Sequence, residues 1–572
     1  MPDLNPAVSA TVLDRDGRLL RAYQVSDGRW RLPVKTADVD ANYIAQLLAY
    51  EDRRFRAHSG VDVLALVRAT GQAAWHGRPV SGASTLTMQV ARLLTETPTR
   101  SIVAKLAQIR LALALERELT KDEILGLYLT LAPFGGNIEG VRAASLSWFG
   151  KEPRRLTPAE AALLVALPQS PNTRRPDRAA KAARGARSRV LARAVRFGAL
   201  SAEDAEAAGR EPLPNRRRAF PQLAPHLADR EARPGEAVTL TISRDLQSAL
   251  EGLLSARVLD MAPAQSAAII VADHRTGEIL AQVGSPGLDY PSRQGFVDMT
   301  SAVRSPGSTL KPLIYGLAFE DGIAHPESLI EDRPMAFGAY TPTNFDEAYS
   351  GTVSVRAALQ RSLNVPAVAL LEAVGPAALM TRLRRAGARP ALPPGQRTSL
   401  AIALGGVGVR LTGLVQVFAG IAAGGKARPL HVHPAASKVP VRMLSDGAAW
   451  QVADVLAGAP APMAASNGQL AYKTGTSYGH RDAWAIGFDG AHVIGIWTGR
   501  PDATPVPGIT GIRDAAPLLF EAFARLKRVP TPLAPPPADV LIVGHAELPG
   551  PLKQVRAARR SSGVPEPEIA FP

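Results

Sequence analysis

Pro306-Gly307-Ser308-Thr309-Leu310-Lys311 is the stretch that decides the fold of the second half of this chain. It opens a predicted helix with the pattern Ser-x-x-Lys, whose spacing brings a hydroxyl and an amine to one helix face. Such a pattern alone arises by chance about once or twice in a chain of this length and composition. Two further motifs follow in order, Ser362-Leu363-Asn364 and Lys473-Thr474-Gly475, the latter between strand-like flanks. The ordered set indicates acyl transfer through a serine.

The residues of these motifs supply the groups that acyl transfer needs. Ser308 is the candidate nucleophile, and a base must take its proton. Lys311 is that base if it is buried and faces a second cation, because both conditions lower the pKa of an amine. Lys473 is the plausible second cation, and it also attracts a substrate carboxylate.

The remaining motif residues suit proton transfer and peptide binding. Ser362 is a candidate for passing a proton, and Asn364 for holding Lys311 or the substrate backbone. Gly475 lets a strand approach closely, and Thr474 and Thr476 lie along that strand, where a peptide can be bound by strand addition.

The first half of the chain holds a second polar constellation. Residues 51–60, Glu-Asp-Arg-Arg-Phe-Arg-Ala-His-Ser-Gly, concentrate two carboxylates, three arginines and a histidine. A solvated helix end would explain these charges alone. Residues 81–89, Ser-Gly-Ala-Ser-Thr-Leu-Thr-Met-Gln, then place four hydroxyls and an amide around a glycine. Such density suits binding of sugar or phosphate oxygens, and a polar turn before a helix would also explain it.

Taken together, these segments resemble the family 51 peptidoglycan glycosyltransferases. The first family motif, Glu-Asp-x-x-Phe-x-x-His-x-Gly, is matched at Glu51, Asp52, Phe55, His58 and Gly60. The second, Gly-x-Ser-Thr-x-Thr-x-Gln, is matched at Gly82, Ser84, Thr85, Thr87 and Gln89. The third is matched only by Lys105, and the fourth by Ile124, Leu125, Tyr128 and Leu129. The fifth is a helix at 159–162.

The resemblance implies a role for each matched residue. Glu51 is the base that takes the proton of an attacking sugar hydroxyl. Lys105, with Arg92 or Arg53, holds the leaving diphosphate. The other substrate contacts that the resemblance implies are Asp52, Phe55, His58, Ser84, Thr85, Gln89 and Gln108. Glu160 closes a predicted capping box that begins at Thr157, so we assign it to structure.

Gln108 departs from the family, which has a carboxylate at this position. An amide neither takes a proton nor binds a divalent cation strongly. No cofactor is firmly implied, and the metal-assisted mechanism, with Mg²⁺ or Mn²⁺, is in question here. The pattern Lys-x-x-Gln, with residues 132–136 and 175–177 downstream, resembles the penicillin-binding protein 1C branch of the family.

The motifs of the second half resemble those of penicillin-binding proteins and β-lactamases, and the match extends to residues 361–368 and 481–484. The resemblance implies an oxyanion hole made by the backbone N–H groups of Ser308 and Thr476. The whole chain is therefore similar to bifunctional class A penicillin-binding proteins. That likeness implies lipid II, nascent glycan, stem peptides and β-lactams as ligands. It is also compatible with other cell-wall synthesis proteins as partners.

The expected fold class is multidomain α+β. We expect an N-terminal β segment at 1–34 and a mainly helical, lysozyme-like glycosyltransferase domain at 35–200. Residues 201–262 are predicted to be a linker, proline-containing and charged up to 236, followed by a strand and a helix. A serine transpeptidase domain with an antiparallel sheet packed between helices is expected at 263–528. Residues 529–572 read as a proline-rich spacer and an incomplete further domain, with a strand at 540–543.

Composition excludes several classes of protein. Of the 572 residues, 46% are hydrophobic and 20% charged, which is typical of a globular protein. The chain has no cysteine, so thiolate zinc sites, cysteine nucleophiles and disulfides are excluded. The net charge of +15 indicates an anionic partner. Residues 181–196 hold six cations and no acid, and an anionic membrane surface is favoured over nucleic acid for them.

The sequence shows neither a signal peptide nor a transmembrane anchor. Residues 411–425 are apolar but shorter than a membrane span, and they predict a buried helix that ends at a glycine pair. By resemblance alone, we expect the periplasmic face of the bacterial inner membrane. Two alternatives remain open: a penicillin-binding hydrolase, either D,D-carboxypeptidase or β-lactamase-like, and a catalytically weak protein that binds or scaffolds the cell wall.

Overall fold

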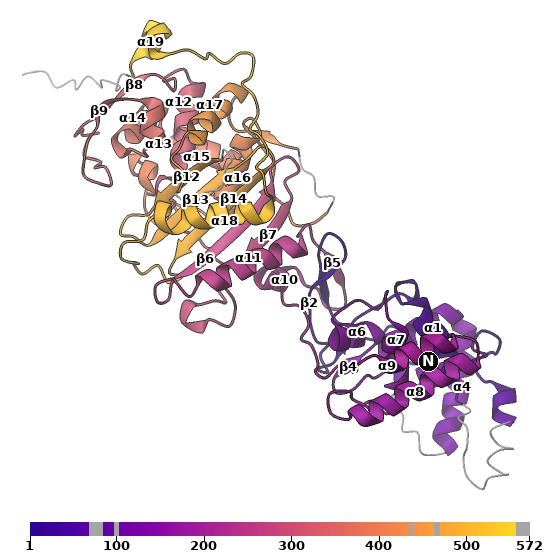
Figure 1. The fold of residues 1–572 in the computed structure, drawn as a ribbon. Coiled ribbons are helices and arrows are strands. Elements are labelled where there is room, and N and C mark those ends of the chain that lie inside the picture. The colour runs from indigo at the N-terminus through magenta and orange to yellow at the C-terminus, as the bar shows by residue number, and fades with distance from the viewer. Residues whose placement is uncertain (68–83, 96–101, 435–438, 463–469, 556–572) are drawn as a thin grey trace, which may run out of the picture. The chain divides into compact units, whose positions relative to one another are not determined.

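The computed structural model describes residues 1–67, 84–95, 102–434, 439–462 and 470–555. The chain forms two compact units (Figure 1). Unit 1 contains residues 1–13, 19–222 and 231–238. Unit 2 contains residues 14–18, 223–230 and 239–572.

Unit 1 is mainly helical. Its helices are α1 (Ala41–Glu51), α3 (Leu86–Thr95), α4 (Ile102–Glu118), α5 (Lys121–Leu131), α6 (Val141–Phe149), α7 (Pro158–Ala166), α8 (Ala180–Arg196) and α9 (Ala202–Arg210). A small sheet has the order β2 (Leu19–Ala22), β1 (Thr11–Leu13) and β5 (Ala237–Thr239), and β3 (Trp30–Arg31) pairs in parallel with β4 (Ile138–Glu139). The hairpin predicted near the N-terminus is confirmed by the antiparallel pairing of β1 with β2.

Helix α7 lies at the centre of the core of unit 1. The predicted capping boxes are both present, at Thr120 with Glu123 before α5 and at Thr157 with Glu160 before α7. Seven of the nine residues of α7 are buried. The carboxylate of Glu160 takes part in the capping box and forms an ion pair with Lys151 at 2.6 Å. The structural assignment of Glu160 is therefore confirmed.

Unit 2 is built on a five-stranded antiparallel sheet. The strand order is β12 (Ala471–Thr476), β13 (Asp482–Phe488), β14 (His492–Gly499), β6 (Ser266–Asp273) and β7 (Ile279–Val283). Helices α11 (Arg244–Arg257) and α18 (Ala516–Leu526) cover one face, where Leu250 and Leu519 pack against Ile269 and Ile494 (Figure 1). Helix α16 (Leu411–Ala422) covers the other face and ends before the glycine pair, as predicted.

Unit 2 has further elements outside this sheet. The helices are α10 (Pro225–Glu231), α12 (Lys311–Glu320), α13 (Val355–Gln360), α14 (Asn364–Val374), α15 (Pro376–Arg385), α17 (Asp446–Ala457) and α19 (Gly550–Lys553). Two short hairpins pair β8 (Leu329–Asp332) with β9 (Gly351–Ser354) and β10 (Lys426–Ala427) with β11 (Val441–Arg442). The expected fold class, helical first and then α+β with an antiparallel sheet between helices, is confirmed.

Part of the predicted linker is wrong. Residues 202–210 form helix α9, whose Ala208 is 1% exposed in the core of unit 1. Arg187 of α8, one of the six cations of residues 181–196, is buried and donates to the carbonyl oxygens of Gly209 and Glu211. The high charge of this stretch concealed an amphipathic helix, because its charged side chains lie on the exposed face only.

The strand predicted at residues 540–543 is absent from the structure. This part of the chain is instead an extended segment that docks on unit 2 through its backbone. The carbonyl oxygen of Leu541 accepts a hydrogen bond from His325 Nε2 at 3.0 Å. Further along, in α19, the carbonyl oxygen of Leu552 accepts one from Ser328 Oγ at 2.5 Å. The backbone of this segment is bound by side chains, whereas a strand forms hydrogen bonds with the backbone of a neighbouring strand. The apolar pattern alone therefore gave a wrong prediction.

Across the described residues, no single helix has both the length and the apolar composition needed to cross a membrane. Helices α14 and α15 satisfy that test only together, and the chain bends by 86° between them.

Two candidate active sites

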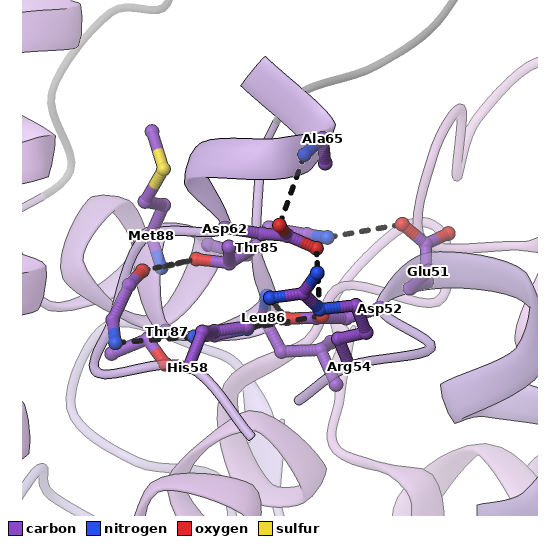
Figure 2. Close-up of polar contacts among 12 residues, drawn as sticks. Glu51, Asp52, Arg54, His58, Asp62, Ala65, Thr85, Leu86, Thr87 and Met88 are labelled. Carbon is purple, nitrogen blue, oxygen red and sulfur yellow. Dashed lines mark hydrogen bonds and ion pairs between the residues drawn. The ribbon is translucent and has the colours of Figure 1, made fainter. Parts of the chain in front are cut away.

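The carboxylate of Asp52, directly after α1, is the hub of the site in unit 1 (Figure 2). It accepts hydrogen bonds from Nε2 of His58 at 3.0 Å and from the backbone N of Leu86 at 2.9 Å. The backbone N–H of Gly60 donates to Nδ1 of the same ring, so the imidazole carries its proton on Nε2. These bonds attach the loop after α1 to the first turn of α3.

Thr85 strengthens the same attachment. Its hydroxyl donates to the carbonyl oxygen of Gly60 at 2.6 Å and accepts from the backbone N of Met88 at 3.1 Å. Phe55 is 1% exposed and packs under the ammonium of Lys121, 4.6 Å from the ring centroid.

The substrate contacts predicted for four residues remain predictions. The side chains of Asp52, Phe55, His58 and Thr85 are buried, and the polar atoms of Asp52, His58 and Thr85 form hydrogen bonds within the protein. They hold α1 against α3, and so they fix the position of Glu51 at the end of α1 relative to the start of α3. Gly82, part of the second family motif, lies outside the described residues.

Glu51 is the last residue of α1, and two amides hold its carboxylate. Gln89 Nε2 donates to Oε2 at 3.0 Å, and Gln169 Nε2 donates to Oε1 at 2.7 Å. Burial raises the pKa of Glu51, and the two amides, Arg193 and Arg174 oppose that rise. A carboxylate of raised pKa is a stronger base near neutral pH, so the site suits abstraction of a hydroxyl proton.

Gln169 is a residue that the sequence motifs do not include. Its Oε1 accepts from Arg174 Nη1 at 3.1 Å and from the hydroxyl of Tyr50 at 3.4 Å. With the amide oxygen occupied in this way, the amide N–H is turned towards Glu51. The sequence gives little signal for this role, because Gln169 lies 118 residues from Glu51 and amides are common in polar turns.

Lys105 of α4 forms the cationic side of the site. Its ammonium donates to the hydroxyl of Ser84, just before α3. Burial lowers the pKa of Lys105, and repulsion by the nearby cation Arg92 lowers it further. Gln108, one turn along α4, is 6% exposed, and its Nε2 has no hydrogen-bond partner among the described residues.

These groups fit an anion and do not fit a divalent metal ion. Mg²⁺ and Mn²⁺ favour carboxylate oxygens, whereas the side chains here are an ammonium, a hydroxyl and an amide. Within the part of the chain that the structure describes, no group of three or more histidine and acidic residues is arranged to hold a metal. An oxygen-rich dianion would instead be attracted by the neighbouring cations Lys105 and Arg92.

Ser308 of the second site lies in a short 3₁₀ helix (Gly307–Leu310) immediately before α12. Two glycines bring this turn against β12. Gly307 has a φ of 53°, and a Cβ at that position would lie 2.4 Å from the carbonyl oxygen of Thr476. A Cβ on Gly475 would lie 2.6 Å from the carbonyl oxygen of Pro306. The backbones around Ser308 and Thr476 are therefore in contact, as an oxyanion hole made by both requires.

Ser362 lies between the two lysines of the second site. Lys473 Nζ donates to its hydroxyl at 2.7 Å, and Lys311 Nζ donates to its carbonyl oxygen at 2.6 Å. Lys311 Nζ also donates to Oδ1 of Asn364 at 2.7 Å. Ser362 has a φ of 61°, a left-handed conformation that non-glycine residues adopt at a cost of about 1–3 kcal/mol. This conformation directs both oxygens of Ser362 towards the amines.

Burial lowers the pKa of both lysines. Burial is the cause for Lys473, whereas Lys311 experiences burial first and then repulsion by Lys473. The pKa of Lys311 is well below its ordinary value, which suits an amine that acts as a base. The geometry thus provides two buried amines joined through one hydroxyl.

A cavity of about 1120 Å³ opens over these groups. Residues that line it include Ser308, Ser362, Asn364, Lys473, Thr474 and Thr476. Lys311 lies beneath them with no exposed surface. The hydroxyl of Thr476 accepts from the backbone N of Gly511 at 3.1 Å, which fixes this end of β12. All predicted residues of the second site are therefore brought together.

Comparison with known proteins finds the same two parts. Residues 16–195 match the Transglycosylase family model, and residues 267–494 match the Penicillin binding protein transpeptidase domain model. The chain is 43% identical to penicillin-binding protein 1C of Escherichia coli over 90% of its own length and 68% of that protein. It is 30% identical to penicillin-binding protein 1B of Vibrio cholerae over 88% of its length and 69% of that protein.

The solved structure of penicillin-binding protein 1A from Haemophilus influenzae shares the fold. The TM-score is 0.55 at 18% sequence identity, with 94% of each chain covered. The two family models, the identity to the 1C protein and the shared fold agree with one another. The chain belongs to the class A penicillin-binding proteins, which are bifunctional and carry a transglycosylase and a transpeptidase domain on one polypeptide.

Proposed function

We propose that this chain polymerises lipid II into glycan strands at Glu51 and cross-links stem peptides through an acyl-enzyme at Ser308. The observation that carries the proposal is a pair of bases held by hydrogen bonds: half-buried Glu51 between two amides, and buried Lys311 between Ser362 and Asn364. We take residues 35–200 and 263–528 as the extents of the two catalytic domains.

In the polymerase reaction, a sugar hydroxyl attacks the anomeric carbon of the donor. Glu51 takes the hydroxyl proton as the new C–O bond forms. The bond to the diphosphate breaks, and its electron pair goes to the departing diphosphate oxygen. Lys105 and Arg92 stabilise that charge, and Gln108 donates its unpaired N–H to a diphosphate oxygen. Residues 52–60 contribute by holding Glu51 in place.

In the acyl-transfer reaction, Ser308 Oγ attacks the peptide carbonyl and Lys311 takes the hydroxyl proton. The negative oxygen of the tetrahedral intermediate is bound by the backbone N–H groups of Ser308 and Thr476. The leaving amine receives a proton through Ser362, which Lys473 supports. An amine of a second stem peptide then attacks the acyl-serine and releases Ser308.

The proposed setting is the periplasmic face of the inner membrane, where a lipid-linked substrate is available. Two features of unit 1 support contact with an anionic lipid surface. Val63, Leu64 and Leu106 are exposed apolar side chains, at 63%, 63% and 56%. On α8, Lys181 and four arginines are exposed cations. Other cell-wall synthesis proteins are further candidate partners.

The test assigns the two reactions to the two sites separately. Chains with Ser308→Ala, Glu51→Gln or both are assayed for covalent labelling by fluorescent penicillin and for polymerisation of lipid II. We expect Ser308→Ala to lose labelling alone and Glu51→Gln to lose polymerisation alone, with both effects additive in the double variant. Labelling of Ser308→Ala would contradict the proposal, as would release of D-alanine and the shortened stem peptide without any cross-linked product.

A further inference from the structure

Asp332, at the end of β8, is a fully buried carboxylate that the proposed mechanism does not use. Its oxygens accept from Nδ2 of Asn344 at 2.8 Å and 3.0 Å, and one of them accepts from the backbone N of Ser350 at 2.8 Å. All of these partners are donors, so the group is bound as an acceptor. An ionised group without compensation costs several kcal/mol when it is buried, so this one requires a reason.

Asn344 connects this carboxylate to the second site. Its Oδ1 accepts from the backbone N of Asn364 at 2.7 Å, and it is itself 4% exposed. Asn364 then accepts from Lys311 Nζ at 2.7 Å and donates to the carbonyl oxygen of Thr343 at 2.7 Å. An unbroken chain of hydrogen bonds therefore runs from Asp332 through Asn344 and Asn364 to the amine of Lys311.

The site contains two buried amines, and Asp332 is positioned to balance one of them. The charged and titratable groups that act on Lys311 are Lys473 of β12 and Asp332 of β8, and Asp332 also acts on Tyr315 of α12. One protonated lysine and one carboxylate form a neutral set, whereas two protonated lysines do not. The charge of Asp332 thus opposes the lowering of the pKa of Lys311 by burial and by Lys473.

We propose that Asp332 and Asn344 are positioning residues of the transpeptidase site. Asp332 holds the side chain of Asn344, and Asn344 in turn holds Asn364, which binds Lys311. The negative charge of Asp332 also stabilises one protonated lysine in a site that contains two lysines. This inference rests on the proposed acylation of Ser308. Neither residue touches the reacting atoms.

The test measures the second-order rate of penicillin acylation as a function of pH on the full chain. Asp332→Asn retains the shape and removes the charge, so the pKa of Lys311 falls further. We expect the acid limb of the profile to move to lower pH by about 0.5 unit or more. Glu331→Gln is the matched control, because it removes one charge from the same strand at a side chain bound to Arg333 and Thr352, and its profile should not move.

Asn344→Ala tests positioning. It breaks the link to Asn364, so acylation should slow by about tenfold or more. Reversible penicillin affinity, measured in the Ser308→Ala background, should change by less than about twofold. If Asp332→Asn does not fold, this split between rate and affinity is the remaining test, and equal loss of both would overturn the proposal.

The outcomes separate this inference from the proposed function. Labelling of the wild type that disappears in Ser308→Ala establishes the acyl-enzyme first. An unchanged acid limb in a folded Asp332→Asn chain then counts against Asp332 alone. A wild-type chain that takes no label overturns the proposed function and this inference with it. Lipid II polymerisation by each preparation provides the folding control for unit 1.

Discussion

Unit 1 has a carboxylate base at Glu51, and unit 2 has an amine base at Lys311. Burial acts on both, but it favours the neutral form of each, so it raises the pKa of Glu51 and lowers that of Lys311. The pKa values of the two bases are thus shifted in opposite directions. Their neighbours differ accordingly: amides that stabilise a carboxylate surround Glu51, and a second cation faces Lys311.

The contrast teaches how each site tolerates substitution. Glu51 depends on hydrogen bonds from neutral side chains, whose loss shifts its pKa moderately. The pKa of Lys311 also depends on neighbouring charges, so a change of charge in this site alters which groups are protonated. We therefore expect the largest effects in unit 2 and graded effects in unit 1.

The largest expected effect is that of Lys311→Ala. Loss of the base should slow penicillin acylation by about 10²–10⁴-fold, with polymerisation unchanged. Lys311→Arg is the informative control, because a guanidinium retains the charge and does not lose its proton. If Arg restored acylation, charge rather than proton abstraction would be the role of Lys311. Rates of fluorescent penicillin labelling measure both variants.

The next effect, in unit 1, is that of Lys105→Ala. Removal of a fixed cation from the leaving diphosphate should slow lipid II polymerisation by about 10²–10³-fold, without a change in penicillin labelling. Initial rates at saturating lipid II measure this. A loss in apparent affinity alone, with the maximal rate retained, would show that Lys105 binds the substrate and does not stabilise the transition state.

A smaller and more specific effect is expected at Gln108. Because the residues near Lys105 do not fit a divalent cation, a chelator should change the wild-type polymerisation rate by less than about twofold. Gln108→Glu adds a carboxylate and should introduce a dependence on Mg²⁺ or Mn²⁺. Strong inhibition of the wild type by chelator would mean that other ligands hold a metal, and it would contradict the electrostatic role given to Lys105.

The sequence predicted the second site more completely than the first, for a physical reason. Within each motif of the second site the spacing is short, from Ser308 to Lys311 and from Ser362 to Asn364, and local structure fixes such spacings. The contacts between the motifs span 51 and 111 residues, so their order along the chain was the signal for the site. Several motif residues of unit 1, among them Asp52, His58 and Thr85, form hydrogen bonds within the protein. Whether a polar side chain meets substrate or protein depends on tertiary packing, which spacing does not report.

Contacts between residues far apart in the chain could also not be predicted from the sequence. Gln169 meets Glu51 across 118 residues, and Asn344 meets Asp332 from a loop without regular structure. The fold class and family were predicted, since both depend on ordered motifs and on helix caps. Residues 202–210 and 540–543 were mispredicted, because local composition does not reveal which face or which partner buries a segment.

The smallest expected effect, and the sharpest test of the contrast between the two bases, is that of Gln169→Met. The substitution retains the volume and removes one N–H from the carboxylate of Glu51, so the pKa of Glu51 should rise further. The base is active when unprotonated, and the acid limb of the polymerisation profile should therefore move to higher pH. That direction is opposite to the shift expected for acylation in Asp332→Asn.

Gln89→Met is the matched variant of Gln169→Met, because Gln89 donates to the other oxygen of the same carboxylate. Both single variants should shift the limb in the same direction, and the double variant should shift it further, since each amide lowers the pKa of Glu51 independently. At pH values well above the limb, the rate should approach that of the wild type within several-fold, because Glu51 is then ionised in every variant. A uniform loss of rate with no shift would instead mean that the amides only orient Glu51, and that burial alone sets its pKa.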